Sequence, residues 1–183
     1  MLEKIISLDK ELFLFLNGLG SPAFDFLWQF ITKQVNWTPF FLLVFYLIYK
    51  KLGLKNLGII ILFIAFLILI CDQTANLFKY TFERLRPCND LQIKDSIRVV
   101  KQSDTFSFFS GHATNSMATT VFVYLIMRKH YKHIYLLFLF PLIFAYSRIY
   151  LGLHFPGDIL AGYTFGATSG FLFYKVYQKK IQA

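Results

Sequence analysis

Residues 57–70 read LGIIILFIAFLILI and contain no charged or polar side chain. They belong to an apolar run over about residues 56–78, and a helix needs roughly 20 such residues to cross the hydrocarbon core of a bilayer. The whole chain has the same bias, because 56% of its 183 residues are hydrophobic and 16% are charged. Soluble domains carry about 25% charged residues. The composition therefore indicates an integral membrane protein and excludes an ordinary soluble domain.

Four further apolar runs are separated from this one by polar or basic segments. They cover about residues 37–49, 112–127, 134–151 and 157–175. Because only helices and closed barrels satisfy their backbone hydrogen bonds in lipid, uninterrupted apolar runs of this kind favour helices. We expect one all-α domain over residues 1–183, with a bundle of five transmembrane helices within residues 37–180.

The segment before the bundle, residues 1–36, has a different pattern. Apolar residues alternate with charged ones up to Leu16, and the sequence NGLGSP at 17–22 then interrupts the run. Neither half reaches spanning length, so we expect an arm of helices lying in the membrane interface. A short tilted hairpin that dips into the membrane, and would count as a sixth span, is the alternative. The arm lacks the features of a secretory signal and is treated as mature protein.

The net charge is +9, and the basic residues lie in short clusters between the apolar runs. This distribution is typical of membrane-protein loops and argues against nucleic acid as a partner. Residues 50–55, 128–133 and 175–183 contain lysine or arginine and no acidic residue. The positive-inside rule places these segments in the cytoplasm. Cys71 lies within an apolar run, so the two cysteines predict no disulfide framework.

Three polar clusters remain, and this topology puts all of them on the outer side. They are Lys79 with Arg86-Pro87, then Ser110-Gly111-His112, then Ser147-Arg148 with His154 and Asp158. Ionisable residues in or near hydrocarbon are costly and indicate function. Arginine and lysine match phosphate oxygens, and a glycine at a helix start allows an anion to approach backbone N–H groups. Two histidines, one oriented by a carboxylate, can supply a nucleophile and an acid.

In residue type, order and spacing, the pattern K-x6-RP, SGH and SR-x5-H-x3-D resembles the type 2 phosphatidic acid phosphatases, the PAP2 superfamily of lipid phosphatases and vanadium haloperoxidases. The resemblance covers about residues 72–160. One position departs from it, since the family usually has proline where this chain has Phe109. This departure removes no chemical group but would loosen the turn before Ser110.

The resemblance implies a role for each matched residue. His154 would attack phosphorus and form a phosphohistidine, Asp158 would orient His154, and His112 would protonate the leaving oxygen and later activate water. The phosphoryl oxygens would be bound by the remaining matched residues, Lys79, Arg86, Ser110, Gly111 and Arg148. No metal or other cofactor is expected, and the sequence shows no cluster with metal-ligand spacing.

The predicted activity is metal-independent hydrolysis of a lipid phosphate or diphosphate in the bacterial inner membrane, at a site facing the periplasm or cell exterior. Undecaprenyl diphosphate is the first choice of substrate. Phosphatidylglycerophosphate and the lipid A 1-phosphate are alternatives, as is phosphate transfer to a second lipid through the same residues. A non-catalytic lipid-binding or lipid-moving protein would be expected to lack one of His112, His154 and Asp158.

Several polar residues also admit structural interpretations. Arg86 and Arg148 could be headgroup anchors that extend to the interface. Arg84 lies outside the matched positions, so we predict an interface anchor there. For Asp72 we predict a cap on the polar end of the second span, with proton handling as the alternative.

Overall fold

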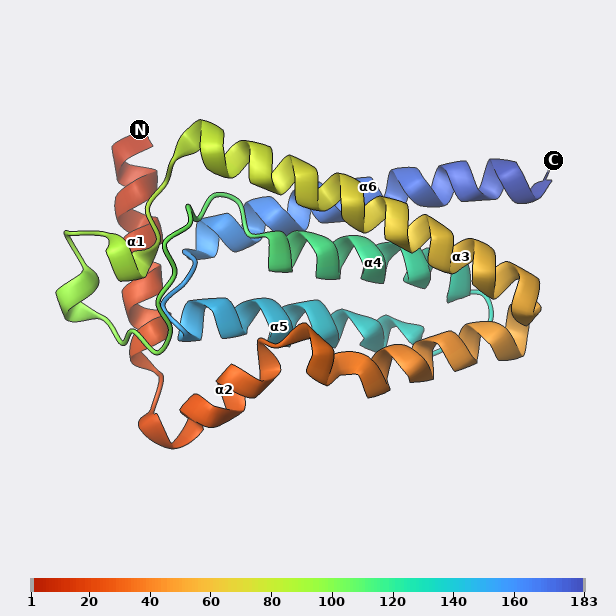
Figure 1. The fold of residues 1–183 in the computed structure, drawn as a ribbon, viewed down its shortest axis with the longest axis horizontal. Coiled ribbons are helices and arrows are strands. Elements are labelled where there is room, and N and C mark those ends of the chain that lie inside the picture. The colour runs from red at the N-terminus through yellow and green to blue at the C-terminus, as the bar shows by residue number, and fades with distance from the viewer. Residues whose placement is uncertain (1, 183) are drawn as a thin grey trace.

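The computed structural model describes residues 2–182, and every regular element in that range is helical. The predicted domain limits Met1 and Ala183 lie outside the described residues. The helices are α1 (Leu2–Gly18), α2 (Asp25–Ile31), α3 (Thr38–Phe82), α4 (Gly111–Met127), α5 (Leu139–Tyr150) and α6 (Pro156–Gln182). Short 3₁₀ turns are η1 (Pro22–Phe24), η2 (Gln34–Trp37), η3 (Pro87–Asn89), η4 (Lys94–Ser96) and η5 (Ile134–Phe138). The expected all-α bundle is confirmed, and Figure 1 shows α3 to α6 running along its long axis.

The first two predicted spans form one folded element instead of two helices joined by a loop. Helix α3 is 45 residues long and reverses direction at Gly53, which has φ 79° and ψ 171°. Glycine adopts such positive φ values without the steric cost that a side chain brings. Residues 50–52 and 54–55 are helical, so the reversal needs a single residue, and the two arms of α3 run back along the bundle (Figure 1).

The outer surface of the bundle is apolar. Among the described residues, only the helical segment Gln34–Asn89 is long and apolar enough to cross a membrane, judged by length and composition. A second apolar helical segment, Ile134–Tyr150, is shorter. Large side chains point outward from both arms of α3 and from α6, among them Leu42, Leu62, Phe66, Leu69, Leu160 and Leu172. Continuous apolar surface of this kind fits contact with lipid.

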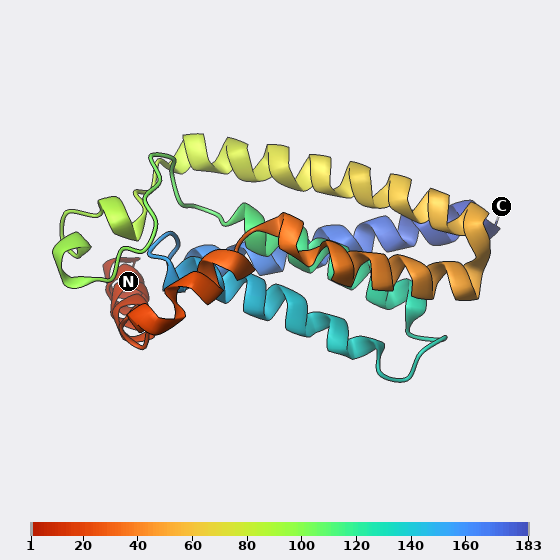
Figure 2. The ribbon, with the colours of Figure 1, turned by 60° about the horizontal axis from the view of Figure 1, so that its bottom comes forward.

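The N-terminal arm closes one end of the bundle. Helix α1 stands across that end in Figure 1 and does not run along the bundle as α3 to α6 do, and Figure 2 views it almost along its axis. That the arm lies in the membrane interface, and does not dip into the membrane as a hairpin, stays a prediction. The buried amide of Asn17 fixes the arm, because its Nδ2 donates to the carbonyl oxygens of Ile149 and Tyr150, each at 3.1 Å.

Helices α4 and α6 pack closely because α6 presents glycine every fourth residue. A Cβ added at Gly162 would lie 2.8 Å from the carbonyl oxygen of Ser110, and one at Gly166 or Gly170 would overlap a carbonyl oxygen of α4. Small residues let helix backbones approach one another in membrane proteins. The seam ends at a hydrogen bond of 3.1 Å from the Ser110 N–H to the Asp158 carbonyl. It therefore holds the start of α4 against the start of α6.

Opposite ends of the bundle differ in charge. The turn at Gly53, the connection after α4 and the C-terminal end of α6 lie together at one end in Figure 1. These are the segments with lysine and arginine and no acidic residue. The starts of α4 and α6 and the 83–108 connection lie at the other end, beside α1 (Figure 1). The predicted separation of the basic segments from the polar clusters is thus present in the fold.

Candidate active site

The three polar clusters meet at one cavity of about 500 Å³ between the two arms of α3, α4 and α5. Six of the eight predicted site residues line it: Lys79, Arg86, Gly111, His112, Arg148 and His154. The wall is apolar farther along, where Val44, Ile64 and Val123 contribute. The cavity therefore joins a cationic end to an apolar trough, which suits a phosphate attached to a lipid.

The turn between α5 and α6 presents His154 to this cavity. Gly152 in that turn has φ 83°, and a Cβ there would lie 3.2 Å from the Arg98 carbonyl oxygen. The carbonyl of Arg148 accepts from the N–H groups of Leu153 and His154, at 2.9 and 3.3 Å. Pro156 then begins α6, where its missing N–H costs nothing. The backbone thus fixes where His154 points.

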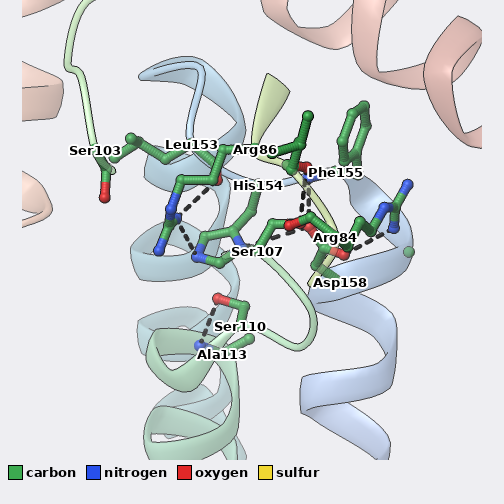
Figure 3. A network of polar contacts seen from close by, with 12 residues as sticks. Arg84, Arg86, Ser103, Ser107, Ser110, Ala113, Leu153, His154, Phe155 and Asp158 are labelled. Atoms are coloured by element: carbon green, nitrogen blue, oxygen red, sulfur yellow. Dashed lines mark hydrogen bonds and ion pairs between the residues drawn. The ribbon is translucent and has the colours of Figure 1, made fainter. Parts of the chain in front are cut away.

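Arg86 uses its whole guanidinium within the site. Its Nε and Nη2 donate to the carbonyl oxygen and hydroxyl of Thr105, both at 2.8 Å. Nη1 donates to the Leu153 carbonyl at 2.8 Å and lies 3.0 Å from His154 Nε2 (Figure 3). With 5% of its surface exposed, Arg86 is not an anchor that extends to the interface. It places a cationic hydrogen-bond donor directly beside Nε2 of His154.

These contacts define the protonation of His154. Arginine can only donate, so Nε2 accepts and the ring proton lies on Nδ1. Burial, and then the positive charges of Arg86, Arg148 and Lys79, hold the pKa of His154 well below its usual range. The imidazole is therefore neutral at pH 7, and its Nε2 lone pair, which faces Arg86 here, carries no proton. This is the state that a nucleophile needs.

Asp158 lies behind His154 and has no exposed surface. Its Oδ2 accepts from the Phe155 N–H at 2.9 Å and lies 3.4 Å from His154 Nδ1. Nδ1 makes no hydrogen bond to Asp158 in this arrangement and has no other partner among the described residues. Asp158 sits in the first turn of α6, as predicted, where the helix dipole favours a carboxylate. It faces the proton-bearing side of the His154 ring.

The prediction for Arg84 was wrong. Instead of extending to the interface, its Nη1 donates to Asp158 Oδ1 at 2.7 Å and its Nη2 to Asp9 Oδ2 at 2.7 Å (Figure 3 shows the Asp158 contact). A buried carboxylate needs a partner of opposite charge, and Arg84 supplies it. No spacing in the sequence connects residue 84 to residues 9 and 158, so only the fold reveals this role.

The start of α4 contributes His112 and Gly111 but not Ser110. The His112 ring stacks on Phe144 with centroids 5.1 Å apart, and Gly111 faces Lys79 and Asp72 across the cavity. Ser110 is fully buried, does not line the cavity and acts as the N-cap of α4, accepting from the Ala113 N–H at 3.5 Å (Figure 3). Its hydroxyl is therefore not among the groups that line the cavity, and its phosphate contact stays a prediction.

Phe109, which stands where the family usually has proline, is buried and packs against the rings of Phe78 and Phe165 at 5.1 and 5.3 Å. These aromatic contacts anchor the turn before Ser110 through a side chain. Whether the turn is looser than one with proline stays a prediction.

The two remaining cations come from α5 and from the end of α3. Arg148 is buried, its Nη1 donates to the Thr32 hydroxyl at 2.7 Å, and its Nε has no partner. Lys79 donates to Asn76 Oδ1 at 3.3 Å. Both are held by polar neighbours while facing the cavity. With Arg86 they form a cationic pocket around His154 and His112.

The cap predicted at Asp72 was wrong, because α3 continues to Phe82. Asp72 instead crosses to α4, where its Oδ1 accepts from Asn115 Nδ2 at 2.8 Å. Both residues line the cavity, as do Asn76, Thr119 and Thr120. A band of uncharged and acidic hydrogen-bonding groups thus lies between the cationic pocket and the apolar trough.

Within residues 2–182, no group of three or more His, Cys, Asp or Glu side chains is arranged to hold a metal ion. The reactive groups that the cavity does assemble are two imidazoles, one backed by a carboxylate, and three cations. Such a set can transfer a phosphoryl group by nucleophilic attack followed by hydrolysis.

Comparison with known proteins agrees with this chemistry. The PAP2 superfamily profile matches residues 56–182. The chain is 34% identical to the lipid A 4'-phosphatase of Bacteroides thetaiotaomicron over 98% of its length and 81% of that protein. It is 32% identical to the lipid A 4'-phosphatase of Porphyromonas gingivalis over 96% and 75%. The undecaprenyl-diphosphatase of Sulfolobus acidocaldarius is 27% identical over 93% and 79%.

Two solved structures share the fold. The transmembrane PAP2-type phosphatidylglycerolphosphate phosphatase of Bacillus subtilis has a TM-score of 0.71, with 21% identity over 97% of this chain and 88% of that one. Aquifex aeolicus LpxE has a TM-score of 0.69, with 23% identity over 92% and 95%. This protein is therefore a membrane-embedded phosphatase of lipids. The chain belongs to the PAP2 superfamily, and the family that the three polar clusters predicted is confirmed.

Proposed function

We propose that the enzyme dephosphorylates a membrane lipid through a covalent phosphohistidine on His154. One observation carries this proposal: His154 and His112 line the same cavity with Lys79, Arg86 and Arg148. The neutral Nε2 of His154 faces the cationic pocket, where a phosphoryl group would be bound. No metal is needed in this scheme, because side chains supply the nucleophile, the acid and the positive charge.

The first step breaks the bond between phosphorus and the lipid oxygen. Nε2 of His154 attacks phosphorus in line with that bond, and His112 gives its proton to the departing oxygen. The negative charge of the bound phosphate favours the protonated form of His112. As the bond from Nε2 to phosphorus forms, the ring becomes cationic, and Asp158 on the Nδ1 side stabilises that charge.

The second step restores the enzyme. A water molecule attacks the phosphohistidine from the side that the lipid oxygen has left, and neutral His112 accepts its proton. The bond between phosphorus and Nε2 then breaks, and inorganic phosphate is released. Throughout both steps, Lys79, Arg86 and Arg148 neutralise the charge on the phosphoryl oxygens.

For the substrate we favour a phosphorylated glycolipid of the lipid A type, dephosphorylated at the 4' position. Two relatives with that name align with nearly the whole chain. The polar band at Asp72 and Asn115 also suits a headgroup with hydroxyl and amide groups beside its phosphate. Hydrogen-bonding groups in a pocket select for substrates that satisfy them.

Undecaprenyl diphosphate, expected from the sequence, is the second candidate. It is supported by the undecaprenyl-diphosphatase relative, at lower identity. Its isoprenoid would fit the apolar trough but leave the polar band without partners. For both lipids, we place the site at the outer surface of the inner membrane, because the basic segments lie at the opposite end of the bundle.

A substrate panel tests the proposal. Purified protein in detergent would receive bis-phosphorylated lipid A, undecaprenyl diphosphate or phosphatidylglycerophosphate, with phosphate release and product mass as readouts. We expect lipid A to lose its 4'-phosphate fastest, in the presence of EDTA, and His154→Ala to release none while remaining folded. Full activity in His154→Ala, or complete loss with chelator, would contradict the mechanism. Preference for undecaprenyl diphosphate would contradict the substrate assignment alone.

A further inference from the structure

The carboxylate of Asp158 has two sides, and a different group holds each. Oδ2 faces His154 and the Phe155 N–H, whereas Oδ1 accepts from Arg84 Nη1 at 2.7 Å. Arg84 does not line the cavity, and its guanidinium lies 4.1 Å from the centre of the Phe155 ring. It therefore acts on the side of Asp158 away from the phosphate site.

Helix α1 supplies the second partner of Arg84. Asp9 Oδ2 accepts from Arg84 Nη2 at 2.7 Å, and the other oxygen of Asp9 accepts from the Gly157 N–H at 2.7 Å. Gly157 is in the first turn of α6, one residue before Asp158. A Cβ at Gly157 would lie 2.8 Å from Asp9 Oδ2, so glycine leaves room for this contact. Asp9 thus contacts both the partner of Asp158 and the helix start that carries it.

The guanidinium of Arg84 donates to two carboxylates, those of Asp9 and Asp158. Arginine tends to bind a single carboxylate through two parallel hydrogen bonds. Here Asp9 occupies Nη2, which leaves Nη1 alone for Asp158. Without Asp9, Arg84 could take both oxygens of Asp158 and draw the carboxylate away from His154. Asp9 therefore protects the contact between Oδ2 and the imidazole.

Another residue of the N-terminal arm contacts the site directly. The Thr32 hydroxyl accepts from Arg148 Nη1 at 2.7 Å, and both side chains are buried. Two separate parts of the arm thus reach the site: Asp9 in α1 contacts the partner of Asp158, and Thr32 after α2 contacts Arg148 of the cavity wall. The superfamily profile begins at residue 56 and includes neither part.

We propose that Asp9 and Arg84 are positioning residues for Asp158, so that the N-terminal helix is part of the catalytic apparatus. The inference rests on the proposed function, in which Asp158 orients His154 and stabilises its charge. The positive charge of Arg84 favours the ionised form of the buried carboxylate, and Asp9 sets how Arg84 holds it. Three groups face Asp158: the charged Arg84 and Arg86 from the α3–α4 connection, and the titratable His154 from the α5–α6 turn. Asp9 from α1 acts on it through Arg84.

The test compares Arg84→Met, Arg84→Lys and Asp9→Asn, each assayed for kcat, KM and pH dependence on the preferred lipid phosphate. We expect kcat to fall about 10- to 100-fold in Arg84→Met and Asp9→Asn, the range for residues that orient a reactive group, with KM nearly unchanged.

In Arg84→Met the acidic limb of the pH–rate profile should move to higher pH, because the carboxylate has lost its cation. In Asp9→Asn it should not move upward, because Arg84 remains. Arg84→Lys should restore part of kcat and return the limb toward its wild-type position.

The matched control is Asp25→Asn. Asp25 is also in the arm and also accepts from an arginine, Arg98 Nη2, at 2.8 Å, but neither residue lines the cavity. Asp25→Asn makes the same chemical change as Asp9→Asn and should leave kcat and the pH profile unchanged. Wild-type kcat in Asp9→Asn, or an equal loss in Asp25→Asn, would overturn the proposal. Asp9→Asn preserves side-chain shape, so this comparison stands even where Arg84→Met does not fold.

A parallel assay of His154→Ala separates this inference from the proposed function. Activity in His154→Ala would mean that the proposed mechanism fails. An inactive His154→Ala beside fully active Asp9→Asn and Arg84→Met would mean that the positioning roles alone are wrong.

Discussion

Arg86 Nη1 lies 3.0 Å from His154 Nε2, so the nitrogen proposed to attack phosphorus is adjacent to a donor that can bind a phosphoryl oxygen. Donor and nucleophile are also fixed to each other, since the same Nη1 donates to the carbonyl of Leu153, the residue before His154. This arrangement uses the planar fork of arginine at position 86, a geometry that lysine lacks.

Arg86→Lys should lower kcat/KM on the order of 10²–10³-fold, the cost of losing a fixed donor to transition-state charge. Lysine keeps the charge but cannot contact Thr105, Leu153 and the phosphate at once. Steady-state kinetics on a lipid phosphate would measure the loss. Arg98→Lys, which alters an arginine of the neighbouring loop outside the cavity, is the control, and an equal loss there would contradict the interpretation.

His112→Asn should lower kcat about 10²–10⁴-fold on a lipid phosphate, the usual contribution of a general acid. The loss should be much smaller on p-nitrophenyl phosphate, because that leaving group departs without a proton. His154→Ala should lose activity on both substrates. Equal losses on both substrates in His112→Asn would argue against its role as the acid.

Gly166→Ala should destabilise the protein by about 1–3 kcal/mol, as overpacking does, and should also lower kcat. The added methyl group would overlap the Thr114 carbonyl oxygen and push α6 from α4. Gly58→Ala is the matched control, since nothing lies within 4 Å of the added Cβ. There, alanine should be neutral or stabilising by roughly 0.5–1 kcal/mol. Thermal unfolding in detergent would compare them, and equal stability of the two variants would contradict the tight packing.

Stability should decrease as the pH falls below about 6.5, the ordinary pKa of histidine. Burial and three cations hold the pKa of His154 well below that value. Between the two values, the unfolded chain binds more protons than the folded one, so the free energy of unfolding rises with pH in this window. His154→Asn should show a shallower dependence when thermal unfolding is measured from pH 7 to pH 5. An unchanged slope would mean that His154 is not buried in its neutral form.

Asp72→Asn should reduce discrimination between lipid A and undecaprenyl diphosphate about ten-fold or more, as expected for hydrogen bonds to a charged group. Lipid A would lose a strong acceptor for its hydroxyl or amide groups. The diphosphate would gain, because a negative charge beside Lys79 is removed. The ratio of kcat/KM values is the readout, and an unchanged ratio would show that Asp72 does not contact the headgroup.

The sequence predicted the site residues best where local spacing and helix physics determine position. Ser110-Gly111-His112 falls at a helix start and His154 four residues before Asp158, so their placement follows from the chain itself. The roles of Arg84, Asp9 and Asp72 depend on contacts between distant segments, which no local pattern encodes. Ser110 was predicted to bind phosphate from the family resemblance, and the fold shows that it also caps α4, which the sequence analysis did not anticipate. The reversal at Gly53 was predicted as a loop because a single glycine with positive φ has the same sequence signal as a longer turn.

Under the proposed mechanism, the glycine seam of α6 connects the apolar interior to the rate of reaction. The separation between His112 at the start of α4, the proposed acid, and His154 just before α6, the proposed nucleophile, depends on side chains that are missing along α6. Methyl groups added at the α6 glycines would push α6 away from α4 and so increase the distance between the two histidines. Substitutions deep in the hydrocarbon region can therefore tune turnover without altering a single reactive group.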